Sequence, residues 1–178
     1  MYNQSLVASL ISNLGIENTE IWANKFVNNF ARTPQGNDRS QLMAVANGLA
    51  DVAIANTYYI GMMLAGKGGE EQLKAAQKLK IAFPNQDNRG THVNISGGGI
   101  LKYSPNKKNA EMFLEFLLSE EAQTHIVNNS FEYPVINTIA PHPIIAKFGE
   151  FKMDKTSVAD FGKYNPDAVK LMDRAGWK

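Results

Sequence analysis

The sequence predicts an α/β fold with a mainly parallel sheet. Two short, mostly apolar runs, at residues 51–56 and 80–83, have the length and composition of buried parallel strands. Segments with apolar residues at helical spacing lie before, between and after these runs. Alternation of strands with helices is typical of α/β proteins. A length of 178 residues suits one large domain or two small ones.

The first thirty residues predict two helices in succession. Ser5–Leu14 carries apolar residues at helical spacing, and Gly15 is the expected stop. A second helix is expected from about Asn18. Three aromatic residues recur there every four positions and give the helix one apolar face: Trp22, Phe26 and Phe30.

The middle of the chain alternates between the two kinds of element. Residues 40–49 read as a short helix and 51–56 as a buried strand. An apolar helical stretch follows at 57–64, and a further helix is expected over 70–79 after a glycine-rich break. Residues 80–83 then predict another strand, which ends at a proline.

The last part of the chain predicts one more strand and three helices. Residues 91–96 alternate like a strand and run into three glycines. An amphipathic helix is expected over 110–118, and Ser119 with the acids after it predicts the start of a second one. The tail from 141 onward is looser, with a last helix over 166–174 that has its proline in the first turn.

The composition argues against several classes of protein. Eighteen basic and seventeen acidic residues give a net charge of +1, whereas nucleic-acid and membrane-surface binders usually carry a strong basic excess. The absence of cysteine excludes disulfides, thiolate zinc sites, iron–sulfur clusters and a cysteine nucleophile, and it leaves the compartment open. No apolar run approaches the roughly 18–20 residues of a membrane span. We therefore expect no nucleic-acid partner.

No catalytic motif is recognisable, so an enzyme is not expected. The three histidines lack metal-site spacing, and no Gly-x-Ser-x-Gly occurs. Ser96–Gly99 lacks the lysine of a phosphate loop and the full glycine pattern of a dinucleotide site, and it reads as a flexible turn. The N-terminus lacks the features of a signal peptide. Either the protein stays in the cytoplasm or the front of a longer precursor is missing.

Tyr58 and Tyr59 form the most informative polar pair. They follow the predicted strand 51–56, and ligand sites of open α/β sheets lie at the carboxyl ends of strands. Two phenolate oxygens suit a hard, highly charged cation such as ferric iron. The phenol pKa is about 10, so only a strong Lewis acid would hold phenolates at neutral pH. Core packing or a stacking surface is the alternative interpretation of the pair.

Several segments of the sequence resemble those of the periplasmic ferric-iron-binding proteins of ABC transporters. The resemblance extends over essentially the whole chain, in the same order and spacing. It is carried by Tyr2–Ser9, Ala31–Asp38, Ala53–Tyr59, Gly90–Gly97, Asn109–Leu117 and Asp167–Trp177.

This resemblance implies a metal site and a two-lobed fold. In the family, the tyrosine pair ligates ferric iron, which maps onto Tyr58 and Tyr59, and a third tyrosine ligand maps onto Tyr2. The family fold is the type II periplasmic-binding-protein architecture, with two α/β lobes closing over iron held in the cleft between them. By analogy, residues 1–86 form most of the second lobe, 87–139 return to the first lobe, and 140–178 pack back on the second. The first lobe is then incomplete.

The implied function is capture of ferric iron in the periplasm and its delivery to an inner-membrane ABC permease, by a monomer and without catalysis. One alternative is a binding protein for an anion or small organic ligand, in which Arg32 and Arg89 would pair with the anion. Another is a truncated product without independent function.

Overall fold

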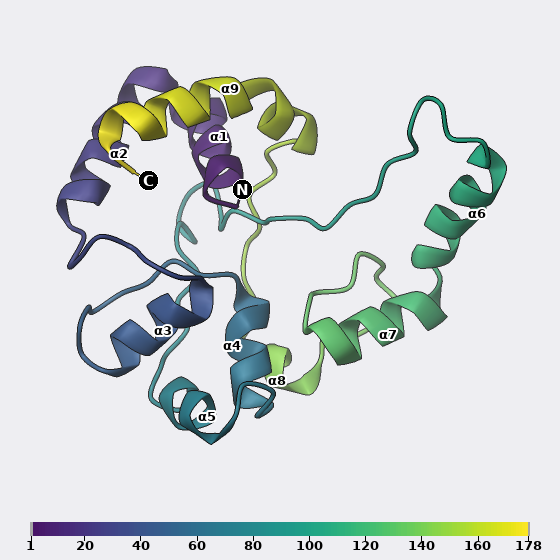
Figure 1. Cartoon of the computed structure of the whole chain (residues 1–178), viewed down its shortest axis with the longest axis horizontal. Helices are drawn as coiled ribbons and strands as arrows, with labels where there is room; N and C mark the ends of the chain where they lie inside the picture. Colours follow the sequence, from purple (N-terminus) through teal and green to yellow (C-terminus); the bar gives the residue numbers. More distant parts are fainter. Residues whose placement is uncertain (1, 178) are drawn as a thin grey trace. The chain divides into compact units, whose positions relative to one another are not determined.

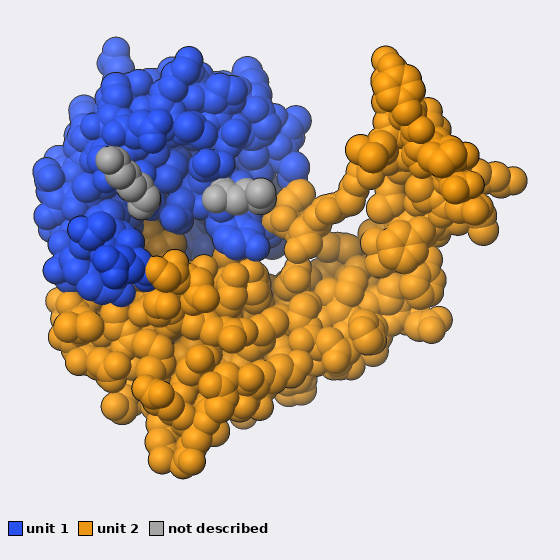
Figure 2. All heavy atoms as spheres, in the orientation of Figure 1, with its two compact units in different colours: residues 1–35, 82–94, 151–178 blue, residues 36–81, 95–150 orange. Residues whose placement is uncertain are grey.

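The computed structural model describes residues 2–177, which fold into two compact units (Figure 2). Unit 1 comprises residues 1–35, 82–94 and 151–178, and unit 2 comprises 36–81 and 95–150. The chain therefore contributes three separate segments to unit 1 and two to unit 2. None of the described helices combines the length and the apolar character needed to cross a membrane.

Unit 1 is built from helices α1 (Tyr2–Leu14), α2 (Ile16–Asn28) and α9 (Val158–Ala175), with α9 packed along the other two (Figure 1). The predicted first helix is confirmed. It ends at Gly15, whose φ of 78° is accessible to glycine without strain. The buried core of unit 1 draws on all three helices and on the C-terminal tryptophan: Val7, Ala8, Ile11, Ala23, Ala168, Leu171 and Trp177.

An aromatic cluster closes one side of this core and confirms the predicted apolar face of the second helix. The rings of Trp22 and Phe26 stack with their centroids 5.0 Å apart, and Phe26 meets Phe30 edge to face at 5.1 Å. Trp177 contacts all three rings, with its centroid 4.9 Å from that of Phe26. The last described residue is thus held in place by aromatic packing.

The last helix begins earlier than the sequence predicts. We expected a helix over 166–174 with its proline in the first turn, but α9 begins at Val158 and carries Pro166 in its interior. Ser157 provides the actual N-cap, with its hydroxyl accepting a hydrogen bond from the amide of Ala159 at 3.2 Å. Packing against α1 and α2 outweighs the intrinsic penalty of an internal proline.

Unit 2 contains the remaining helices of the described chain. They are α3 (Asp38–Ala46), α4 (Thr57–Leu64), α5 (Glu70–Ala76), α6 (Lys107–Leu117), α7 (Glu120–Ser130) and α8 (Pro143–Ala146). The core of α3, α4 and α5 is formed by Leu42, Ile60, Met63, Ala75 and Ala76. Helix α7 starts where predicted, because the Ser119 hydroxyl accepts from the amide of Ala122 at 3.2 Å. The short helix α8 was not predicted.

The three predicted strands are not formed within residues 2–177. Residues 51–56, 80–83 and 91–96 carry no strand assignment, so the expectation of a mainly parallel sheet is not met by this structure. Among the described residues, the β-type pairing is one parallel bridge between Thr91 and Met153. The Thr91 amide donates to the Lys152 carbonyl, and the Thr91 carbonyl accepts from the Asp154 amide, both at 2.8 Å. The physical reason is that a parallel strand needs a neighbouring strand on which to form its ladder. No described segment pairs with 51–56 or 80–83.

The boundaries of the two units differ from the lobe boundaries that the resemblance implies. Residues 1–35 and 151–178 share unit 1, whereas 36–81 share unit 2 with 95–150. The lobe boundaries at 86/87 and 139/140 remain predictions about the two-lobed parent architecture.

Candidate metal centre

Tyr58 and Tyr59 lie together in the first turn of α4, directly after an extended segment. The N-cap residue Asn56 has φ −73° and ψ 140°, and the chain turns helical at Thr57. The two rings lie with their centroids 4.2 Å apart and their planes inclined by 34°. Both tyrosines are half-buried. The helix thus places two phenol side chains next to each other, which is the first requirement if both are to bind the same metal ion.

Helix α3 supports the start of α4. The Asp38 carboxylate accepts a hydrogen bond from the amide of Asn56 at 3.1 Å, which fixes the extended segment just before the tyrosines. The Arg39 guanidinium lies 5.9 Å from the centroid of the Tyr59 ring and donates to the Met62 sulfur at 3.3 Å. The Arg39 Nε is buried without a hydrogen-bond partner among the described residues. A positive charge therefore lies beside the tyrosine pair.

Sequence reasoning did not single out Asp38 and Arg39. A usable signal was present, because Asn37 and Ser40 have the spacing and residue types of a helix start. In the structure the Asn37 side chain accepts from the Ser40 amide at 3.3 Å, and the Ser40 hydroxyl accepts from the Asn37 amide at 3.4 Å. This reciprocal cap sets the direction of α3 and the positions of Asp38 and Arg39.

Tyr2, the third predicted ligand, begins α1 in unit 1 and is 44 % exposed. The tyrosine pair belongs to unit 2. The structure thus brings Tyr58 and Tyr59 together, while the convergence of Tyr2 with them remains a prediction.

Other metal-ligating groups do not form a competing site in the described part of the chain. No three histidine, aspartate or glutamate side chains of residues 2–177 cluster as metal ligands do. His92 is half-buried against Phe161, with ring centroids 5.2 Å apart, and burial lowers the pKa of its imidazole to about 4.

Arg89 is committed to a buried ion pair in unit 1. Its Nη1 lies 2.6 Å from Asp154 Oδ2, and the same carboxylate accepts from Ser9 at 2.8 Å and from Thr156 at 2.7 Å. Burial opposes ionisation of Asp154, but these hydrogen bonds and the charge of Arg89 outweigh it and lower the pKa of the carboxyl. The predicted pairing of Arg89 with an anionic ligand is thus disfavoured. Arg32 Nη1 donates to the carbonyl of Thr33 at 3.1 Å.

Tyr58 and Tyr59 thus form a pair of adjacent phenol groups at the start of α4 in unit 2. The chain belongs to the family of bacterial extracellular solute-binding proteins, whose pattern matches residues 5–124.

Its relatives include iron-binding proteins. It is 49% identical to Iron uptake protein A1 of Synechocystis sp. over 99% of this chain and 49% of that protein. Among solved structures, it is similar to a Trichodesmium IdiA (FutA) protein in complex with iron and citrate, at 50% identity and a TM-score of 0.93. It also matches a ferric binding protein from Campylobacter jejuni, at 38% identity and a TM-score of 0.95. Both structural matches cover 99% of this chain and 56% of the other. The chain thus spans about half the length of the relatives that it matches.

Proposed function

We propose that this chain is the tyrosine-bearing part of a periplasmic solute-binding protein that captures ferric iron and delivers it to an ABC permease. The observation that carries the proposal is the Tyr58–Tyr59 pair, with ring centroids 4.2 Å apart at the start of α4. Support comes from relatives named as iron uptake and ferric binding proteins that match almost the whole chain. The proposed protein performs no catalysis.

The chemistry of the pair suits Fe³⁺. A phenol with an ordinary pKa of about 10 is protonated at neutral pH, so binding requires that the metal displace the proton. A trivalent cation is a strong enough Lewis acid to do so, and it prefers oxygen donors. Tyr2 is the proposed third ligand. Three phenolates leave further coordination positions for water, an anion or groups outside this chain.

The test is a titration of the folded chain with ferric iron followed by visible absorption. Phenolate bound to Fe³⁺ gives a charge-transfer band, so wild-type protein should become coloured. Tyr58→Phe and Tyr59→Phe should each weaken the band, and the double variant should abolish it. Phenylalanine keeps the ring packing of the pair and removes only the oxygen, so a lost band reports lost ligation.

Tyr103→Phe is the matched control, because Tyr103 is 85 % exposed and lies outside α4. It should leave the band unchanged. Tyr2→Phe should produce a smaller loss than either change in the pair if Tyr2 is a third ligand. Binding should weaken as the pH falls, since protons compete for each phenolate oxygen. A folded chain that shows no band at any ferric concentration free of precipitation would contradict iron binding by this chain.

The main alternative ligand is an anion. The Arg39 guanidinium beside Tyr59, with its Nε buried and without a partner in the described chain, is the observation that favours it. Calorimetric titration with citrate alone and with ferric citrate separates the two ligands. A protein that binds the anion would give a binding heat with citrate alone, and Arg39→Gln would abolish it, whereas an iron-dependent site would respond only to ferric citrate.

A further inference from the structure

A buried polar network in unit 1 joins separate segments of the chain through one carboxylate. The Asp154 side chain is 5 % exposed, and its Oδ2 accepts from Arg89 Nη1 at 2.6 Å and from the Ser9 hydroxyl at 2.8 Å. Its Oδ1 accepts from the amide and the hydroxyl of Thr156, at 3.0 and 2.7 Å. Ser9 belongs to the first segment of unit 1, Arg89 to the second and Asp154 to the third. One carboxylate thus links all three segments of this unit.

Helix α1 is attached to this network at two points. Ser9, which is fully buried, donates to Asp154 as described. Asn13, one turn further along, donates from Nδ2 to the Thr156 hydroxyl at 2.7 Å, and the same Nδ2 lies 3.4 Å from Asp154 Oδ2. Hydrogen bonds to an ionised carboxylate are stronger than those between neutral groups, and they are directional. The network therefore fixes how α1 is rotated about its own axis.

Tyr2 begins the same helix and shares the face that the network holds. At about 100° per residue, Ser9 and Asn13 are each displaced from Tyr2 by only about 20° around the helix axis, in opposite directions. Along the axis, Ser9 lies two turns from Tyr2, or about 10 Å. The helix is continuous over Tyr2–Leu14. A rotation of α1 that the network prevents at Ser9 is therefore also prevented at Tyr2.

We propose that Asp154 is a positioning residue for Tyr2 and acts through Ser9 and Asn13 of α1. A buried ion pair is weak evidence for a contribution to stability, because apolar residues of similar volume often stabilise a core equally well. Apolar packing accepts small rotations of a helix, whereas directed hydrogen bonds favour one setting. The inference rests on the proposed function, in which Tyr2 is the third ferric ligand. Groups that orient metal ligands typically change metal affinity by roughly 10–100-fold.

The experiment is a double-mutant cycle on the full 178-residue chain, with ferric affinity measured from the charge-transfer band in competition with nitrilotriacetate. Ser9→Ala removes the hydroxyl that reaches Asp154 and keeps the carboxylate paired with Arg89. It should lower ferric affinity at least about threefold, which is less than the loss typical of a group in direct contact with a metal ligand. In the Tyr2→Phe background, Ser9→Ala should have no further effect. In the Tyr58→Phe background it should keep its full effect.

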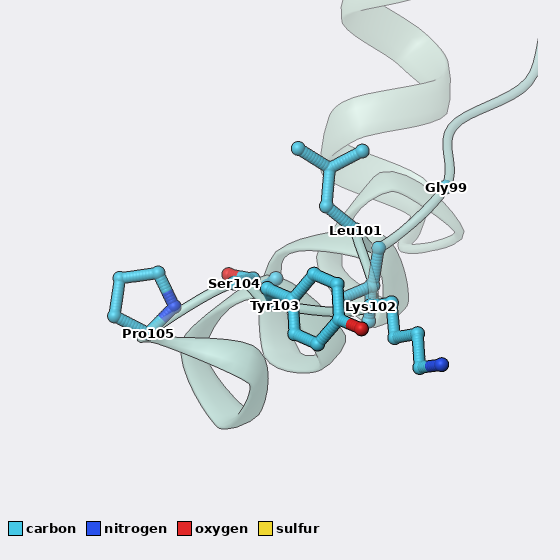
Figure 3. A pocket seen from close by; sticks show the side chains of 8 residues that line it. Gly99, Leu101, Lys102, Tyr103, Ser104 and Pro105 are labelled. Atoms are coloured by element: carbon cyan, nitrogen blue, oxygen red, sulfur yellow. The ribbon is translucent and has the colours of Figure 1, made fainter.

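Ser12→Ala is the matched control for Ser9→Ala. Ser12 lies on the same helix and also donates to a carboxylate, that of Asp160 at 3.2 Å, but it is displaced by about 80° from Tyr2 around the axis. It should leave ferric affinity unchanged. Tyr103→Phe is the control for Tyr2→Phe, because Tyr103 belongs to unit 2 and lines an open hollow there (Figure 3).

Three results would overturn the positioning role: Ser9→Ala binds iron as wild type does, its effect persists after Tyr2→Phe, or Ser12→Ala causes an equal loss. In each case the wild-type band remains, so the proposed function stands. A wild-type chain without a band contradicts the proposed function, and the positioning role falls with it. If Ser9→Ala alters the far-ultraviolet circular dichroism, Asn13→Ala at an exposed position repeats the cycle with the same expected results.

Discussion

His92 is the titratable side chain whose protonation the fold changes most clearly. Both of its ring nitrogens are buried, and neither has a hydrogen-bond partner within residues 2–177. Loss of hydration on burial lowers the pKa of His92 from 6.5 to about 4. The negative charge of Asp154 partly opposes this shift by raising the pKa. The positive charge of Arg89 adds a smaller lowering. The folded chain therefore keeps a neutral imidazole well below neutral pH.

We expect this histidine to make stability depend on pH between about 6.5 and 4. In that window the unfolded chain binds a proton at His92 and the folded chain does not, so the free energy of unfolding falls as the pH is lowered. His92→Phe retains an aromatic ring against Phe161 and removes the proton. Urea unfolding at several pH values should show a flatter dependence for the variant.

Asp154 provides the contrast within the same unit. Its pKa is lowered from 3.8, so its stabilising contribution is present above that value and is lost as the pH falls further. Asp154→Asn should therefore change how the free energy of unfolding depends on pH below about pH 4. It should leave the dependence between about pH 4 and 6.5 largely unchanged. An unchanged slope in His92→Phe would contradict the account of that residue.

At the scale of the helix, α4 is positioned by close packing at Gly61. Gly61 of α4 faces Ile145 of α8 and Phe131 at the end of α7, and all three are buried. A Cβ atom built on Gly61 would lie 2.7 Å from the Ile145 Cδ1 and 3.1 Å from the Phe131 Cβ. The absence of a side chain here lets α4 pack closely onto these neighbours.

Gly61→Ala should therefore destabilise the protein by about 1–3 kcal/mol, although alanine is the better helix former. Gly162→Ala in α9 is the matched control, because a Cβ there meets nothing within 4 Å. The control should stabilise by about 0.5–1 kcal/mol through helix propensity alone. Denaturant unfolding measures the change in the free energy of unfolding for both variants. If the two variants change it in the same direction, the packing explanation is wrong.

At the scale of the whole molecule, the chain supplies three candidate phenolate ligands and matches about half of its relatives' length. Under the proposed function, the remaining coordination positions are open to small competing ligands. We expect a strong chelator to remove ferric iron from this chain faster than from full-length Synechocystis Iron uptake protein A1. Decay of the charge-transfer band after mixing measures both rates, and equal rates would count against the three-ligand site.

The helices of this protein were largely predictable from sequence, because their causes are local. Backbone hydrogen bonds within a helix join residues four apart, and the apolar spacing of Trp22, Phe26 and Phe30 is visible without knowledge of the fold. The caps at Gly15 and Ser119 were predictable for the same reason. The adjacency of Tyr58 and Tyr59 and the resemblance to ferric-iron-binding proteins were likewise visible in the sequence.

Tertiary structure decided the features whose partners are distant in the chain. A parallel strand at 51–56 needs a neighbour from elsewhere, and its own composition cannot provide one. The partner of Arg89 is Asp154, and the cation beside Tyr59 is Arg39, because folding brings together groups that lie far apart in sequence. The start of α9 before Pro166 was likewise decided by packing against α1 and α2, which outweighs a local propensity.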